Sequence, residues 1–163
     1  MLFFKFSIPF FWKQSPTLEY LPKPVIYEHV EHEKAFNLHI EKLIHNYGAT
    51  VLINLIKHTK SEGIMEEKFR ALHKNCPLKN HVGYEYFDFY TECSRLRYDR
   101  LNILVGRLRD RLNHFGYFIQ NRGVVSRLQT GVFRTNCMDS LDRELLNLRQ
   151  NAPTQNMSEN FQY

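Results

Sequence analysis

A single run of seven residues constrains the fold of this chain more than any other segment. Thr50–Ile56 reads TVLINLI, which is apolar, rich in β-branched side chains and short enough for a buried strand. The polar segment His58–Gly63 follows it as a turn, and a helical pattern begins directly afterwards. A buried strand next to helices is typical of an α/β layer structure.

The remaining segments alternate in the same way, so the sequence predicts an α/β fold with a mixed β-sheet flanked by helices. Further strands are expected at Ser7–Trp12, Val82–Phe89, Tyr117–Gln120, Val124–Gln129 and Gly131–Asn136, with a hairpin turn at Asn121–Gly123. Helices are expected at Glu28–Tyr47, Ile64–Asn75, Glu92–Phe115 and Leu141–Gln150. Gly48 stands where the first helix would have its C-terminal cap. Residues 151–163 are polar and without periodicity, and we expect them to be disordered.

Charge and cysteine content restrict the class of function. Lys and Arg number 22 against 17 Asp and Glu, and the net charge of +5 favours anionic partners such as phospholipid headgroups, phosphorylated small molecules or nucleic acid. Three cysteines without a CxxC pair argue against a disulfide framework or a zinc site. No apolar run approaches the roughly 18 residues that a membrane-spanning helix needs.

The segment after the last predicted strand carries the clearest chemical motif, a cysteine with an arginine six positions later. Cys137 and Arg143 enclose Met138, Asp139, Ser140, Leu141 and Asp142. The backbone N–H groups of such a loop can bind phosphate oxygens, and the arginine fork can bind two of them. A thiolate can attack phosphorus to form a phosphocysteine, which water then hydrolyses. Asp139 or Asp142 could protonate the leaving alkoxide or activate that water.

The spacing by itself leaves a second interpretation open. Cys137 would then be a buried apolar side chain, and Arg143 a solvated residue in the first turn of a helix. The arginines of Arg95–Arg111 also have two interpretations. They form either the solvated face of a long helix or a basic surface that faces anionic lipid.

Residues on both sides of the loop resemble the signature of the Sac family of phosphoinositide phosphatases, R-x-N-C-x-D-C-L-D-R-T-N. Residues 134–143 read RTNCMDSLDR, so only Ser140 departs from the signature within this stretch, where it replaces the second cysteine. Four earlier segments are similar to family segments as well: SIPFFW at 7–12, GATVLINL at 48–55, FDFYTEC at 87–93 and RYDRL at 97–101. The resemblance therefore extends from Ser7 to Arg143.

This resemblance implies a metal-free hydrolase that removes phosphate from phosphatidylinositol monophosphates, such as phosphatidylinositol 4-phosphate, through a phosphocysteine. Cys137 would be the nucleophile, Arg143 the phosphate-binding residue and Asp139 the acid/base. Arg134 and Asn136 would support the loop through hydrogen bonds. No cofactor is implied. The implied partner is a phosphoinositide lipid, not nucleic acid, on the cytosolic face of endomembranes of the endoplasmic reticulum or Golgi.

Two departures from the family pattern keep alternatives open. Glu144 and Leu145 stand where the signature has Thr-Asn, and Glu144 places a negative charge beside the phosphate-binding arginine. A complete Sac domain also has a β-rich subdomain before this region and a helical portion after it, so we expect an incomplete domain, with the partial catalytic domain at residues 1–150. The alternatives are an inactive fragment that binds anionic lipid or a protein partner, and a phosphatase of soluble substrates.

Other residue types point to no further site. His29, His32, His39 and His45 lie in one predicted helix, but their spacing does not form the zinc motif H-E-x-x-H, so we expect no metal. The aromatic residues between Tyr84 and Tyr90 fit a half-buried strand better than a surface for stacking nucleic-acid bases.

Overall fold

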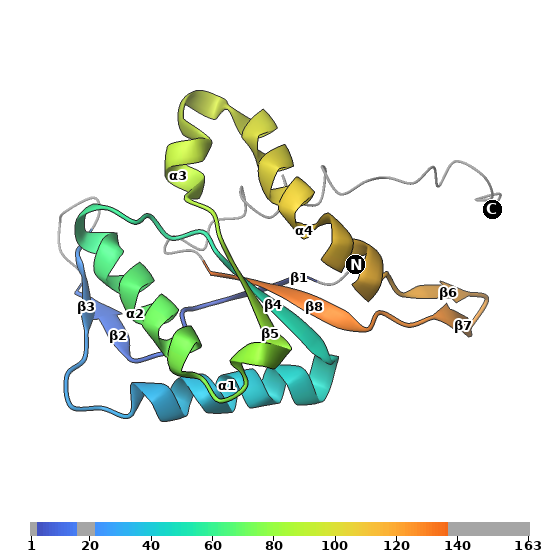
Figure 1. Ribbon diagram of the computed structural model, residues 1–163, viewed down its shortest axis with the longest axis horizontal. Coiled ribbons are helices and arrows are strands. Elements are labelled where there is room, and N and C mark those ends of the chain that lie inside the picture. The colour runs from blue at the N-terminus through green and yellow to red at the C-terminus, as the bar shows by residue number, and fades with distance from the viewer. Residues whose placement is uncertain (1–2, 16–21, 137–163) are drawn as a thin grey trace.

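A four-stranded parallel sheet forms the centre of the molecule (Figure 1). A computed structural model describes residues 3–15 and 22–136 of the chain. The strands lie in the order β1 (Phe3–Phe6), β8 (Gly131–Asn136), β4 (Ala49–Asn54) and β5 (Val82–Tyr86), and every neighbouring pair is parallel. The strand nearest the end of the described chain, β8, therefore lies between two strands from earlier parts of the sequence.

Helices cover both faces of this sheet, because a parallel connection has to cross over one face. In Figure 1, α1 (His32–Tyr47) and α2 (Gly63–Asn75) lie on one side and α4 (Leu101–Phe115) on the other. The two helical layers enclose separate apolar clusters, one built around Phe36 and Phe69 and the other around Leu104 and Phe133. The predicted α/β class, with sheets flanked by helices, is confirmed.

The two central strands are buried along almost their whole length. All six residues of β8 and five of the six residues of β4 are buried. The seven-residue apolar run that predicted a buried strand is explained by this position, since both faces of β4 meet helices. The strand itself spans Ala49–Asn54, so its end lies two residues earlier than the sequence pattern predicted.

Within residues 3–15 and 22–136, antiparallel pairing is confined to two small sheets. One joins β2 (Trp12–Gln14) to β3 (Pro24–Ile26), and the other is the predicted hairpin of β6 (Ile119–Asn121) and β7 (Val124–Arg127). Arg122 and Gly123 form the hairpin turn with φ of 46° and 82°. Two positive φ angles in succession match the right-handed twist of the strands, which explains the glycine at the second position.

The first helix begins later than its apolar pattern suggested but ends where predicted. It begins at His32 instead of Glu28 and ends at Tyr47. Gly48 follows with φ of 76°, and a Cβ atom built there would lie 2.7 Å from the carbonyl oxygen of Thr130. Only glycine allows both this conformation and this close approach, so the predicted C-terminal cap is confirmed.

The prediction of a strand at Ser7–Trp12 is wrong. The first strand ends at Phe6, and the next begins at Trp12. Between them the chain bends, with the Phe10 N–H donating to the carbonyl of Ile8 at 2.9 Å. Pro9 has no N–H to contribute to a strand ladder. The apolar residues that suggested a strand, Ile8 and Phe10, are buried against the α1 and α2 cluster instead.

The prediction of one long helix at Glu92–Phe115 is also wrong, because the chain turns twice before α4 begins. A short helix, α3 (Phe89–Glu92), follows β5, which therefore ends at Tyr86 and not at Phe89. Asp88 caps α3 by accepting a hydrogen bond from the Thr91 N–H at 3.0 Å. Two 3₁₀ turns, Ser94–Leu96 and Tyr98–Arg100, then lead into α4. The predicted helix Ile64–Asn75 is confirmed as α2, whereas the helix Leu141–Gln150 and the tail at 151–163 lie outside the described residues.

Candidate functional site

The carboxyl ends of three neighbouring strands meet at one edge of the sheet. The Leu55 N–H donates to the carbonyl of Asn136 at 3.1 Å, and the Phe87 N–H donates to the carbonyl of Asn54 at 3.0 Å. These bonds continue the strand ladders one residue past β4 and β5, so all three chains leave the sheet at the same level. Parallel α/β sheets bind their ligands at this edge.

The predicted phosphate loop begins at this edge, because Cys137 follows Asn136 in the chain. Cys137, Met138, Asp139, Ser140, Leu141, Asp142 and Arg143 lie outside the described residues. The two residues predicted to support the loop, Arg134 and Asn136, lie in β8, and neither exposes any side-chain surface. Both point to the face of the sheet that α1 and α2 cover, because they alternate with Phe133, which packs against α4.

Asn136 and its neighbour Asn54 form the first polar group of the site. The two residues are partners in the register of β8 and β4. The Asn136 Nδ2 lies 3.5 Å from Asn54 Oδ1, and Asn54 Nδ2 donates to the hydroxyl of Tyr84 on β5 at 3.0 Å. The ring of Tyr84 stacks on His73 of α2, with 5.0 Å between ring centroids, and burial raises the pKa of the Tyr84 hydroxyl. Side chains from three strands are thus linked in one buried row.

The amide oxygen of Asn136 has no hydrogen-bond donor among the described residues, although it is buried. A buried acceptor without a donor is costly, and native proteins seldom leave one in that state. The oxygen belongs to the last residue before the loop. It can therefore accept an N–H from the chain that follows β8.

Arg134 forms the second polar group. Its Nε donates to Nε2 of His39 on α1 at 2.8 Å, and its Nη2 donates to the carbonyl of Ser7 at 2.7 Å. Burial lowers the pKa of Arg134 to about 9, so the guanidinium stays positive at neutral pH. Burial, followed by the positive charges of Arg134 and Lys42, lowers the pKa of His39 to about 4. His39 is therefore neutral at neutral pH, which leaves its Nε2 able to accept from the guanidinium.

A third group, centred on Glu66, lies beside the chain that leaves β4. Glu66 of α2 is 2% exposed, and its carboxylate contacts Nδ1 of His58 at 2.9 Å and Nε of Arg70 at 3.3 Å. The ring of His58 meets the ring of Tyr86, the last residue of β5, edge to face at 6.1 Å. Burial raises the pKa of the Tyr86 hydroxyl to about 12, with smaller contributions from Asp88 and Glu66. These contacts hold the turn after β4 close to the end of β5.

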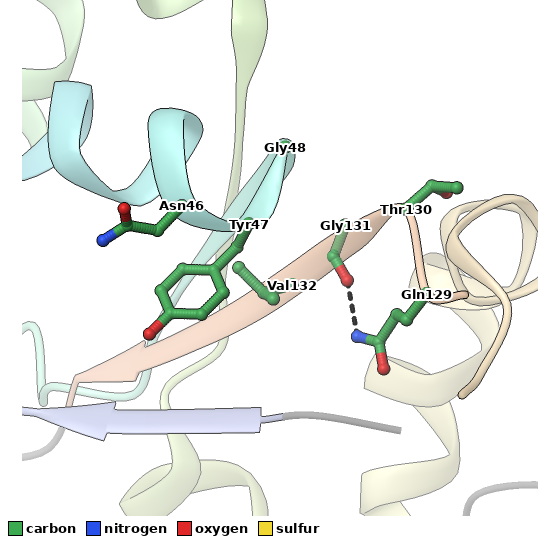
Figure 2. Close-up of a pocket in the computed structure, with 7 residues that line it drawn as sticks. All are labelled: Asn46, Tyr47, Gly48, Gln129, Thr130, Gly131 and Val132. Carbon is green, nitrogen blue, oxygen red and sulfur yellow. Dashed lines mark hydrogen bonds between the residues drawn. The ribbon is translucent and has the colours of Figure 1, made fainter. Parts of the chain in front are cut away.

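An open hollow of about 290 Å³ lies at the other end of β8. Figure 2 shows Asn46 and Tyr47 on one side of it and Gln129 on the other, with the first residues of β8 between them. From its first to its last residue, β8 spans five steps of about 3.3 Å, so roughly 17 Å of strand separates this hollow from the start of the predicted loop. The hollow is therefore not part of the candidate active site.

The sequence indicated some of these residues and not others. Arg134 and Asn136 were predicted, whereas His39 was considered only as a metal ligand and Asn54 only as part of a strand. An asparagine inside the otherwise apolar run TVLINLI is the signal that could have singled out Asn54, because a buried amide requires partners. Nothing local in the sequence pairs His39 with Arg134, which lies 95 positions away.

The described residues contain neither a metal-binding cluster nor a membrane-spanning helix. No three His, Cys, Asp or Glu side chains in that part of the chain are grouped closely enough to hold a metal ion. None of the helices at positions 3–15 and 22–136 is long and apolar enough to cross a bilayer.

Comparison with known proteins shows the family of this chain. A family model described as the SacI homology domain matches residues 3–94, which is more than half of the chain. The chain is 44% identical over 138 residues to phosphatidylinositol-3-phosphatase SAC1 of Drosophila melanogaster and 41% identical over 138 residues to phosphatidylinositol-3-phosphatase SAC1-A of Danio rerio. It is 34% identical over 138 residues to phosphoinositide phosphatase SAC6 of Arabidopsis thaliana. Each match covers 84% of this chain but 23% of the relative. The chain belongs to the SacI homology domain family.

Proposed function

We propose that this chain carries the nucleophile-bearing part of a phosphoinositide phosphatase, which hydrolyses phosphatidylinositol monophosphates such as phosphatidylinositol 4-phosphate through a phosphocysteine. One observation carries the proposal: β8 is buried and in register with β4, and it ends at Asn136, directly before the Cys137–Arg143 sequence. The names of the relatives, which are phosphoinositide phosphatases, support the same substrate class.

The burial of the other two cysteines supports Cys137 as the nucleophile. Cys76 is 2% exposed in the cluster formed with α1 and α2, and Cys93 is 6% exposed in the cluster formed with α4. A phosphate cannot reach either sulfur, so neither side chain is suited to attack one. Cys137 is the remaining cysteine, and in the sequence it directly follows Asn136, the last residue of β8.

In the proposed reaction the Cys137 thiolate attacks phosphorus, and the bond from phosphorus to the inositol oxygen breaks. Asp139 gives its proton to the leaving oxygen. A water molecule then attacks the phosphocysteine, with its proton passing to Asp139, and phosphate leaves while the thiolate is restored. Arg143 binds two phosphate oxygens throughout, and backbone N–H groups of Met138, Ser140, Leu141 and Asp142 surround them.

Arg134 and Asn136 would set the start of this loop. The positive charge of Arg134 lies buried two residues before Asn136, and a fixed cation in a site of low dielectric favours a nearby thiolate and phosphate. The amide oxygen of Asn136 would accept an N–H of the loop. We propose the cytosolic face of an endomembrane as the place of action, since phosphoinositide headgroups are displayed on a membrane surface.

The direct test is release of phosphate from vesicles that contain phosphatidylinositol 4-phosphate, measured with the purified chain and with Cys137→Ser. We expect release from the unmodified chain and none from the variant, whose hydroxyl is a far weaker nucleophile than a thiolate. Equal release from both proteins would contradict the assignment of Cys137. Activity on a soluble phosphoester, but not on the lipid, would contradict the substrate class.

A second candidate function is lipid binding without turnover, which Glu144 favours because its charge would oppose a phosphate dianion at Arg143. Restoring the family residue with Glu144→Thr separates the two candidates. If turnover appears only in Glu144→Thr, the natural chain is a binding module. If both chains release phosphate at similar rates, Glu144 points away from the phosphate.

A further inference from the structure

We propose that one surface of the protein docks onto an anionic lipid bilayer. This surface, the lipid-contact patch, consists of Tyr90, Leu96, Lys57 and Arg95. The patch lies at the carboxyl edge of the sheet. This surface rests on the proposed function, because a lipid substrate would bring the protein to a membrane. Binding to vesicles can nevertheless be measured separately from phosphate release.

The location of the patch follows from the ends of two strands and from one contact. Tyr90 belongs to α3, which follows the carboxyl end of β5, and Lys57 lies three residues past the end of β4. The Lys57 Nζ lies 3.7 Å from the centroid of the Tyr90 ring, so the turn after β4 and helix α3 are in contact. Because β4 is the direct neighbour of β8, the patch and the start of the Cys137 loop share one edge of the sheet.

The apolar part of the patch is unusually exposed. Leu96 is 76% exposed, more than any other large apolar side chain in the described part of the chain, and Tyr90 is 68% exposed. Tyr98 continues this surface, because its ring lies 6.5 Å from that of Phe89 in α3. The turn Ser94–Leu96 that carries Leu96 contacts helix α3, which carries Tyr90. An exposed leucine and an exposed tyrosine on adjoining elements can enter the boundary between lipid headgroups and acyl chains.

The backbone holds Leu96 outward in a conformation that leucine seldom adopts. Arg95 and Leu96 both have positive φ, 57° and 61°, although neither is glycine. The turn is fixed from the other side by Arg97, whose Nε and Nη2 donate to the carbonyl and the hydroxyl of Ser94, each at 3.2 Å. Left-handed residues with a Cβ atom are strained and are concentrated at functional sites.

The charges around the apolar side chains match an anionic surface. Neither Lys57 nor Arg95 forms an ion pair with any described residue. The neighbouring acids have partners or stand alone. Glu92 binds Arg100 at 2.8 Å, Asp88 caps α3, and the Glu62 carboxylate accepts from the Lys57 backbone N–H at 3.4 Å. Asp99 is the exposed acid of the turn. Basic side chains around a protruding leucine favour an anionic bilayer over a neutral apolar partner.

The test is co-sedimentation of the full chain carrying Cys137→Ser with vesicles of phosphatidylcholine and phosphatidylserine that contain no phosphoinositide. We expect binding at low salt and weaker binding at high salt. Leu96→Asn keeps a residue that tolerates the left-handed conformation, yet it removes the apolar side chain. It should lower the partition coefficient about tenfold, as expected for loss of one buried leucine.

Leu128→Asn is the matched control, because Leu128 is 67% exposed and lies just before β8, at the opposite edge of the sheet. We expect it to bind vesicles as the unmodified chain does. Circular dichroism shows whether each variant is folded, and Leu96→Gly, which relieves the strain, gives a second variant with the same expected loss.

Three outcomes would overturn the proposal: no vesicle binding by the parent chain, equal loss in Leu96→Asn and Leu128→Asn, or full binding by Leu96→Asn. These outcomes do not depend on the phosphatase assignment, because the vesicles contain no phosphoinositide and the protein lacks the Cys137 thiol. If the chain binds these vesicles but the unmodified protein releases no phosphate from phosphoinositide, the lipid-contact patch is supported and the phosphatase activity is contradicted.

Discussion

The two edges of the parallel sheet hold polar groups of different kinds. At the carboxyl edge, Asn54, Arg134 and Asn136 are fully buried, and hydrogen bonds to other elements fix them. At the amino edge, Asn46 and Thr130 are exposed around an open hollow. Burying a polar group costs free energy unless the group is hydrogen-bonded. The polar groups of the carboxyl edge therefore depend on their partners for stability, whereas the exposed groups of the amino edge do not. In this fold, buried polar groups held by hydrogen bonds indicate the candidate site, whereas an open surface hollow does not.

Among substitutions at the two edges, Arg134→Ala should lower the stability of the protein most. The substitution removes a buried cation and leaves Nε2 of His39 and the carbonyl of Ser7 without the donor that the guanidinium supplies. We expect the free energy of unfolding to fall by about 3–4 kcal/mol, as is typical when a buried polar group is removed and a cavity remains. Urea unfolding followed by circular dichroism measures it.

Arg134→Lys is the control for that change, because lysine keeps the charge but cannot reach both acceptors with a planar fork. Its unfolding free energy should lie between those of the parent chain and Arg134→Ala. A stable Arg134→Ala protein would show that the carboxyl edge does not depend on this cation, and the contrast between the edges would lose its main support.

Asn54→Ala should have the next largest effect. Its amide donates to the Tyr84 hydroxyl and accepts from the Ile56 N–H, and it contacts the amide of Asn136. Leaving these buried groups unpaired should lower the unfolding free energy by about 2–3 kcal/mol. A double-mutant cycle with Tyr84→Phe should give a coupling of about 1 kcal/mol, measured by chemical denaturation. Strictly additive effects would mean that the buried row does not act as a unit.

The pH dependence of stability tests the His39 contact. The folded ring stays neutral down to about pH 4, whereas the unfolded chain takes up a proton near pH 6.5. Between these values the unfolded state binds more protons, so stability should fall as the pH is lowered from about 6.5 to about 4. Allowing for solvent screening of a partly exposed ring, we expect a loss of about 1 kcal/mol. His39→Gln keeps an acceptor for Arg134 but cannot titrate, so its thermal unfolding should depend less on pH in this window.

The smallest effect is expected at the amino edge, where Asn46→Ala provides an exposed counterpart to Asn54→Ala. Surface substitutions of this kind usually change the unfolding free energy by less than about 0.5 kcal/mol. We also expect unchanged phosphate release, because the hollow is separated from the loop by the length of β8. A clear loss of phosphate release in Asn46→Ala would show that the amino edge contributes to the site.

The sequence allowed the layers to be predicted more reliably than the contacts between them. Local patterns predicted β8, α2, the hairpin and the end of α1, because each depends on the apolar side chains or the glycine of its own segment. They failed at Ser7–Trp12, where Pro9 interrupts the strand. They also failed at Glu92–Phe115, where the left-handed residues Arg95 and Leu96 interrupt a segment whose apolar pattern continues. The motif predicted Arg134 and Asn136, but their partners His39 and Asn54 come from distant segments. Only the three-dimensional packing brings such pairs together.

The position of β8 in the sheet has a consequence for how the protein is made. Its register pairs Phe3 with Phe133 and Ala49 with Gly131, so the strand that leads to the candidate loop joins segments more than 80 and more than 120 residues earlier. During synthesis β4 and β5 can pair, but the edge of β4 remains open until β8 leaves the ribosome. Contacts between residues so far apart in the sequence slow folding. Until β8 pairs with β4, the unpaired edge of β4 favours aggregation. The yield of folded protein in cells should therefore depend on chaperones that protect β4 until β8 has been synthesised.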